Sequence, residues 1–250
     1  MHGYHPTDTA FTPPLTPPMP STIASQSHDS TVAPPSASAS RKARFWDRIA
    51  NQYAADPIAD MAGYEATLRR VQSLLSVDQA VLEIGCGTGS TALRLAPLTQ
   101  SFLATDVSTH MIAIAQKKLA AEPVSPLRFA LADADAPVFG RSEYDVALAF
   151  SVLHLVSDLD RSLALVAQAL RPGGLLISKT PCVADMNPLI PYVALPLMRA
   201  LGKAPHVLCF KEEALLSAIT RQGMEIVSIE RHGTLSKKDI RVFIVARKLR

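Results

Sequence analysis

The sequence predicts an α/β fold in which a doubly wound, mostly parallel sheet carries helices on both faces. Three observations in the 250 residues predict it. Short apolar runs alternate with stretches of helical periodicity over residues 80–178. A glycine-rich turn follows the first of these runs. Near the C-terminus, two more strand-like runs have only a short connection, which requires an antiparallel pair.

The first 40 residues differ in composition from the rest of the chain. Pro, Ser, Thr and Ala dominate them, and they contain no Lys or Arg. Such a segment cannot bury enough apolar surface to offset the entropy lost on ordering. We therefore expect a disordered tail over 1–40 and one folded domain over 41–250.

Helical periodicity begins at Arg41, and we expect a helical cap over 41–76. Phe45, Ile49 and Tyr53 recur at four-residue steps, and a second amphipathic stretch covers 61–75. After the cap, the predicted strands are 80–84, 102–105, 127–131, 144–150 and 175–178. The helices predicted between them lie near 88–97, 109–120 and 158–170.

The C-terminal part is predicted to complete a seven-stranded sheet. A helical stretch over 211–222 ends before Gly223, and strand-like runs cover 225–230 and 241–246. Because the last two runs must pair antiparallel, we expect one reversed strand at the end of the sheet.

The turn after the first strand contains Gly85, Gly87 and Gly89. Glycine tolerates the positive φ angles that such a turn needs, and it lets a ligand approach the backbone closely. The N-terminus of the following helix presents free amides. We therefore expect this loop to hold a nucleotide-like cofactor.

Acidic residues follow the next two predicted strands. Asp106 comes after the second strand and Asp133 after the third. Because ligands of open parallel sheets bind beyond the carboxyl ends of the strands, Asp106 is placed to bind ribose hydroxyls. Asp133 could accept a hydrogen bond from an adenine amine.

Five motifs occur in order: the run 82–89, Asp106-Val107-Ser108 with Met111, Asp133-Ala134, the run 144–154, and Arg171-Pro172-Gly173-Gly174. Together they resemble the class I S-adenosylmethionine-dependent methyltransferases. The resemblance implies a Rossmann-like fold, S-adenosyl-L-methionine as cofactor, and a methyltransferase activity. The cofactor-binding residues it implies, with Tyr53 from the cap, are Glu83, Gly85, Cys86, Gly87, Gly89, Asp106, Val107, Met111, Asp133, Ala134 and Ser151.

Two other functions stay open at this point. An NAD(P)-dependent oxidoreductase would share the glycine-rich loop, although the spacing G-x-G-x-G differs from the dinucleotide fingerprint. A non-catalytic module that only binds S-adenosylmethionine would share every motif.

Methyl transfer is expected to be an in-line displacement, for which the protein mainly aligns the nucleophile. If the acceptor must lose a proton, His154, which follows the fourth strand, is the best-placed base, and His206 is a second candidate. We expect no metal site, because the three cysteines lack zinc-type spacing.

The segment 181–210 is apolar and interrupted by prolines. We expect a lid over a small, hydrophobic acceptor; an extra core layer or a dimer interface are alternatives, so monomer and homodimer both stay open. Cys182 and Cys209 flank this segment. We expect buried thiols, and an arsenic or thiol acceptor would give both cysteines a role.

Charge and hydropathy exclude several partners. The net charge of +3 and the lack of a basic stripe argue against nucleic acid. No apolar run is long enough for stable membrane insertion. Few cysteines and no secretory signal favour a cytoplasmic location.

Overall fold

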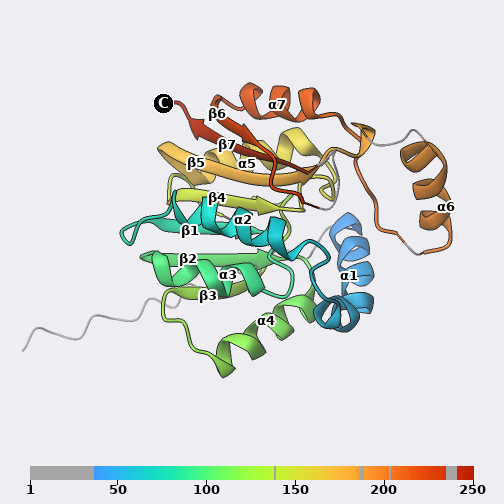
Figure 1. The fold of residues 1–250 in the computed structure, drawn as a ribbon, viewed down its shortest axis with the longest axis horizontal. Helices are drawn as coiled ribbons and strands as arrows, with labels where there is room; N and C mark the ends of the chain where they lie inside the picture. The colour runs from blue at the N-terminus through green and yellow to red at the C-terminus, as the bar shows by residue number, and fades with distance from the viewer. Residues whose placement is uncertain (1–36, 138, 186–188, 203, 235–240) are drawn as a thin grey trace, which may run out of the picture. The chain divides into compact units, whose positions relative to one another are not determined.

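The computed structural model describes residues 37–250 except 138, 186–188, 203 and 235–240. The described residues belong to one compact unit (Figure 1). The predicted tail lies outside the described residues up to residue 36. Helix α1 (Ala37–Ala55) already includes the last four residues of that predicted tail.

Seven strands form one sheet, as predicted. Their order is β3-β2-β1-β4-β5-β7-β6, and neighbours among β1 to β5 run parallel. The strands are β1 (Ala80–Ile84), β2 (Ser101–Asp106), β3 (Leu127–Leu131), β4 (Tyr144–Phe150), β5 (Leu170–Pro181), β6 (Met224–Glu230) and β7 (Arg241–Lys248).

The prediction that the reversed strand lies at the end of the sheet is wrong. β7 is antiparallel to both β5 and β6, so it lies inside the sheet and β6 forms the edge. Helix α7 (Glu212–Arg221) carries the chain past one strand position before β6 begins. The short return from β6 then places β7 in that position, where it pairs on both sides.

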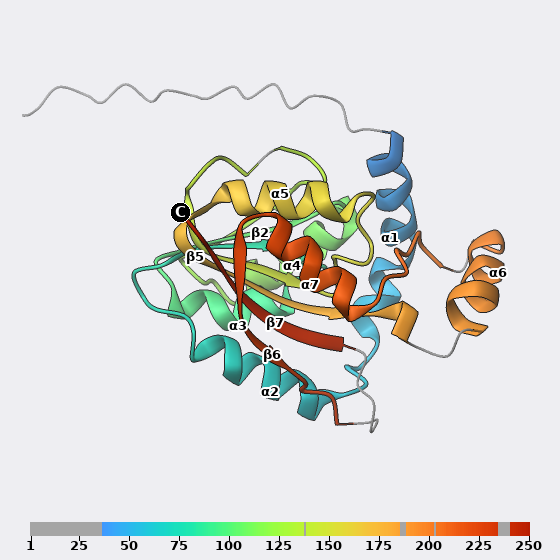
Figure 2. The same ribbon diagram turned by 90° about the horizontal axis from the view of Figure 1, so that it is seen from above.

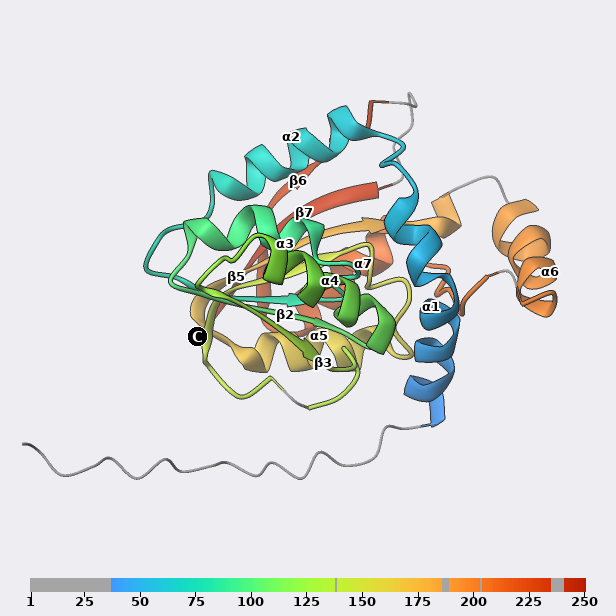
Figure 3. The same cartoon turned by 90° about the horizontal axis from the view of Figure 1, so that it is seen from below.

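Helices cover both faces of the sheet (Figures 2 and 3). Alternate side chains of β1 point to opposite faces: Leu82 joins a core with α5 and α7, whereas Val81 joins a core with α2 and α3. The remaining helices and helical turns are α2 (Met61–Gln72), α3 (Ser90–Leu95), η1 (Ala96–Leu98), α4 (Thr109–Ala121), α5 (Leu159–Ala169), η2 (Val183–Asp185), η3 (Ile190–Ala194) and α6 (Leu195–Ala200).

Helix α1 packs against α4 through a specific polar contact. Ser108 caps α4, and its hydroxyl donates to Asp47 Oδ1 at 2.6 Å. The backbone N–H of His110 donates to the same oxygen at 3.0 Å. Asp47 therefore fixes α1 over the carboxyl end of β2, where the functional site lies.

The insertion 181–210 packs on the core only near its two ends, where Cys182 is buried and Leu208 and Phe210 contact the core cluster. Its large apolar side chains are exposed at Leu189, Tyr192, Leu197, Met198 and Leu201. Arg48 of α1 donates to the carbonyl of Gly202 at 2.6 Å, which ties the segment after α6 to the cap. Among the described helices, none combines the length and the apolar character that crossing a bilayer requires.

Candidate functional site

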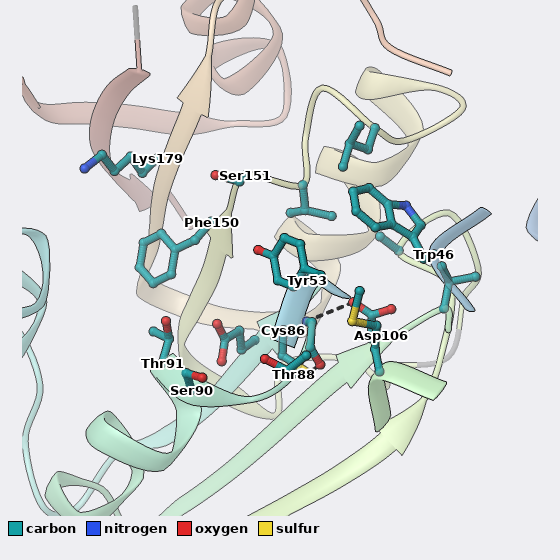
Figure 4. Close-up of a pocket in the computed structure, with 18 of the residues that line it drawn as sticks. Trp46, Tyr53, Cys86, Thr88, Ser90, Thr91, Asp106, Phe150, Ser151 and Lys179 are labelled. Atoms are coloured by element: carbon teal, nitrogen blue, oxygen red, sulfur yellow. Dashed lines mark hydrogen bonds between the residues drawn. The ribbon is translucent and has the colours of Figure 1, made fainter. Parts of the chain in front are cut away.

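A cavity of about 530 Å³ opens where β1, β2, β3 and β4 end. This is the edge at which open parallel sheets bind ligands, and the volume suits a small molecule. In Figure 4, Trp46 and Asp106 lie at one end of the pocket and Lys179 at the other, with Tyr53 between them. Residues of α1 and α2 complete the wall.

Each position of the loop after β1 that holds a glycine requires one for a different physical reason. Gly85, Gly87 and Gly89 have φ angles of 68°, 54° and 75°. A Cβ on Gly85 would lie 2.4 Å from Val152 Cγ2, and one on Gly89 would lie 2.5 Å from Phe129 Cζ. A Cβ on Gly87 would meet only Tyr53 Cε1, at 3.8 Å, so Gly87 presents bare backbone to the cavity.

Asp106 joins the loop to the end of β2. Its carboxylate accepts from the N–H of Gly87 and from that of Ser108, both at 2.9 Å. Burial raises the pKa of Asp106, against the hydrogen bonds from these two amides, which favour the charged form. Asp106 thus shapes the loop and also lines the cavity.

Glu83 is the most perturbed acid of the site. It is 2% exposed, lines the cavity, and its Oε2 has no hydrogen-bond partner. Burial, followed by the nearby charge of Asp106, raises the pKa of Glu83 to about 8. A buried carboxyl oxygen without a partner fits a ligand that brings a hydrogen-bond donor.

The Glu83→Gln variant should therefore change how stability depends on pH. Because the folded-state pKa lies above the ordinary 4.5, the native state holds this proton more tightly than the unfolded chain does. The resulting stability is present at low pH and lost as the pH rises through about 8. Between about pH 5 and pH 8, the free energy of unfolding in urea should fall by up to roughly 3–4 kcal/mol more in the wild type than in the variant. Parallel pH profiles would contradict this assignment.

Asp133 lines the cavity and already forms an ion pair with Lys42. Lys42 of α1 donates to Asp133 Oδ1 at 2.6 Å and to Asp135 Oδ2 at 2.7 Å. Ser162 and the N–H of Ser157 also donate to Asp135. An adenine amine at Asp133 would therefore share this carboxylate with Lys42.

Most predicted cofactor residues come together around the cavity. The residues that line it are Tyr53, Glu83, Gly85, Cys86, Gly87, Asp106, Val107, Met111, Asp133, Ala134 and Ser151. Gly89 is absent from the lining, and its contacts with Phe129 and Ala115 give it a packing role. Burial, followed by the charges of Glu83 and Asp106, raises the pKa of the Cys86 thiol well above its ordinary value, which keeps it neutral.

The predicted bases do not reach the cavity. His154 is absent from the lining, and its buried Nδ1 has no hydrogen-bond partner. Burial lowers the pKa of His154 to about 4, so it accepts a proton poorly at neutral pH. His206 is exposed and also outside the lining. Neither placement supports a catalytic role.

The three cysteines are unpaired. Cys182 is buried, as expected, but Cys209 is exposed. No described residue of 181–210 lines the cavity, so the arrangement of this segment does not support an acceptor held by these thiols.

Several lining residues were missed by the sequence reasoning. Lys42, Thr67 and Arg241 come from the cap and from the last strand, where no motif marks them. Lys179 could have been found, because it follows the predicted strand 175–178 at the same sheet edge as Asp106. Its ammonium donates to Thr67 Oγ1 at 2.7 Å.

Comparison with known proteins agrees with this geometry. Residues 82–176 match the model of a family described as a methyltransferase domain. An O-methyltransferase of Penicillium expansum is 29% identical over 74% of the chain, which spans 65% of that relative. A reducing polyketide synthase of Preussia isomera is 33% identical over 45% of the chain, which spans 5% of it.

A solved structure shows the same fold. An S-adenosylmethionine-dependent methyltransferase from Mesorhizobium loti superposes with a TM-score of 0.64 at 22% identity, covering 75% of this chain and 98% of its own. The chain thus spans less than two thirds of both curated relatives described above, while it shares nearly the full extent of this solved structure.

Proposed function

We propose that the chain transfers a methyl group from S-adenosylmethionine to a small, largely apolar acceptor. The proposal starts from the chain's membership of the class I S-adenosylmethionine-dependent methyltransferases. The observation that carries the proposal is the cavity that joins the glycine loop, Asp106 and buried Glu83, whose Oε2 has no hydrogen-bond partner. The relatives named O-methyltransferase favour oxygen as the accepting atom.

The residues of the cavity fit the parts of this cofactor. Asp106 is suited to the ribose hydroxyls, because a carboxylate accepts from two donors at once. Buried Met111 offers an apolar contact for the adenine, and Asp133 with Ala134 lies at the same end. Glu83 would accept from the amino group of the methionine portion, and Gly87 leaves room for close approach.

When bound, the cofactor supplies a methyl group already activated by a positive sulfur. The protein then has to bind, align and exclude water. Tyr53 and Trp46 form an edge-to-face pair with ring centroids 6.2 Å apart, and both line the cavity. Holding the acceptor in line with the methyl group can lower the activation barrier by roughly 7–11 kcal/mol in well-oriented systems.

Cofactor binding should release a proton near neutral pH. The ammonium of the cofactor's methionine portion would favour ionised Glu83, whose pKa burial raises to about 8. Calorimetric titration with S-adenosylhomocysteine, in two buffers of different ionisation enthalpy, should therefore give different heats. The Glu83→Gln variant should give equal heats in both, and wild-type heats independent of buffer would count against this role for Glu83.

Turnover needs a separate test, because a module that only binds the cofactor would pass the calorimetric one. Incubation with cofactor carrying a labelled methyl group and a cell extract should yield a labelled small apolar product. Binding without any labelled product would favour the non-catalytic alternative, and labelled protein or nucleic acid would refute the proposed acceptor class.

A cytoplasmic location stays a prediction.

A further inference from the structure

A chain of hydrogen bonds leads from the Lys179 end of the cavity to the edge of the sheet. Lys179 Nζ donates to Thr67 Oγ1 at 2.7 Å, and this hydroxyl lies 3.1 Å from His232 Nδ1. His232 Nε2 lies 3.1 Å from Glu230 Oε2 at the end of β6. Lys179 and Thr67 line the cavity, whereas His232 and Glu230 stand behind them.

The partners of His232 fix its tautomer. Burial alone would raise the pKa of Glu230, but hydrogen bonds from Ser228, Arg70 and His232 hold it below its ordinary value, so Glu230 is a carboxylate. A carboxylate only accepts, so Nε2 must carry the proton that it donates to Glu230. In the neutral ring, Nδ1 is then an acceptor and faces the Thr67 hydroxyl.

Thr67 can therefore pass a proton on. Its single hydroxyl proton can be donated either to the carbonyl of Gly63, at 2.8 Å, or to His232 Nδ1, at 3.1 Å. Its oxygen meanwhile accepts from Lys179 and retains a second lone pair. His232 is held between Thr67 and Glu230 and makes a tilted ring contact with Phe243, with ring centroids 4.5 Å apart.

From this arrangement we infer that Lys179, Thr67 and His232 form the acceptor end of the site and take a phenolic or enolic hydroxyl as the methyl acceptor. The inference rests on the proposed methyltransferase function and deepens it. Lys179 and Thr67 would contact the acceptor oxygen. His232 acts through Thr67, and Glu230 orients His232.

The proposed step moves two protons along the hydrogen-bond chain and one methyl group to the acceptor. The acceptor hydroxyl gives its proton to Thr67 Oγ1, while the Thr67 proton moves to His232 Nδ1, which becomes an imidazolium beside Glu230. The acceptor oxygen uses one of its electron pairs to form the new bond to the methyl carbon. The carbon–sulfur bond breaks, its electron pair stays on sulfur, and the sulfonium would become a neutral thioether. Lys179 stabilises the negative charge that develops on the acceptor oxygen.

The acidity of the acceptor decides its chemical class. A phenol has a pKa near that of tyrosine, about 10, whereas a hydroxyl as weakly acidic as bulk water has one of about 15.7. Removing the proton from the second kind of hydroxyl is therefore harder by roughly 6 pK units. A single ammonium beside the oxygen favours the oxyanion, but it does not offset a difference of that size.

The side chains around this end suit a planar apolar molecule. Phe150 pairs in register with Lys179 on the neighbouring strand, and both line the cavity with Tyr64 and Ile58. Figure 4 shows Phe150 and Ser151 next to Lys179 at this end. Asp60 and Arg241 also line the cavity, and Arg241 Nη2 lies 3.4 Å from Asp60 Oδ2.

The test compares two phenols as probes in mildly alkaline buffer with labelled cofactor. 4-Nitrophenol is already ionised there, whereas 4-methylphenol must lose its proton. The Thr67→Val variant should slow methylation of 4-methylphenol by roughly a hundredfold, the scale of general-base catalysis, and slow 4-nitrophenol much less. Thr67→Ser should restore the rate, and His232→Gln should reproduce the selective loss.

Lys179→Met should slow both phenols, because both react as an oxyanion. Lys117→Met, which changes an exposed lysine of α4, is the matched control and should change neither rate. Equal loss on both phenols in Thr67→Val, or no rescue by serine, would overturn the relay. A wild type that binds S-adenosylhomocysteine but methylates neither phenol would overturn the acceptor class, whereas one that does not bind it would instead overturn the proposed function.

Discussion

Replacing Asp106 with alanine is expected to weaken S-adenosylmethionine binding by at least roughly a hundredfold, which corresponds to about 3 kcal/mol. The carboxylate holds the N–H groups of Gly87 and Ser108, both at 2.9 Å, so its loss releases the glycine loop as well as the ribose contact. Hydrogen bonds to charged groups contribute roughly 1.5–3 kcal/mol each. Calorimetric titration with the cofactor measures the change.

Two further variants make the Asp106 test specific. Asp106→Asn keeps one acceptor oxygen, so its affinity should fall between those of the wild type and the alanine variant. Asp160→Ala removes an exposed carboxylate that pairs with Arg221 on the surface, and its affinity should equal that of the wild type. If Asp106→Ala binds the cofactor within threefold of the wild type, the carboxylate does not contribute to the site.

Replacing Gly85 with alanine should lower the free energy of unfolding by about 3 kcal/mol. A φ of 68° costs an alanine roughly 1–2 kcal/mol, and the added Cβ would stand 2.4 Å from Val152 Cγ2, where overpacking typically adds 1–3 kcal/mol. For a domain of this size, the melting temperature should fall by roughly 6–12 °C. Thermal unfolding followed by circular dichroism gives the measurement.

The strain and the clash at Gly85 can be separated. Gly173 has a φ of 80° and open space where a Cβ would lie, so Gly173→Ala should show the backbone strain alone. Adding Val152→Ala to Gly85→Ala removes the clashing methyl groups and should recover part of the loss relative to the single variants. Equal destabilisation by Gly85→Ala and Gly173→Ala would show that contact with Val152 plays no part.

The core of the site could be predicted because its signals are local. The turn at Gly85, Gly87 and Gly89 interrupts an apolar run, and Asp106 directly follows the next strand. Parallel strands end at the same edge of a sheet, so residues far apart in sequence meet without any knowledge of packing. The same rule applied to Lys179 predicts its place in the lining of the cavity.

The rest of the site depends on long-range packing. Lys42 meets Asp133 across 91 residues, and Thr67 meets His232 across 165. The helical periodicity of α1 and α2 identifies a polar face on each helix, but it does not predict which strand that face will contact. His154 shows that a local signal can also mislead. Its position after β4 suggested a catalytic base, yet its ring lies outside the cavity lining.

The placement of β7 inside the sheet has a bearing on how the chain folds during synthesis. The ribosome produces β6 before β7, and among the described strands β6 pairs only with β7. Until residues up to Lys248 have emerged, β5 and β6 therefore each expose an edge that could pair with other chains. Nascent chains arrested before β7 should need chaperone protection, whereas completed chains have both edges joined by a single strand.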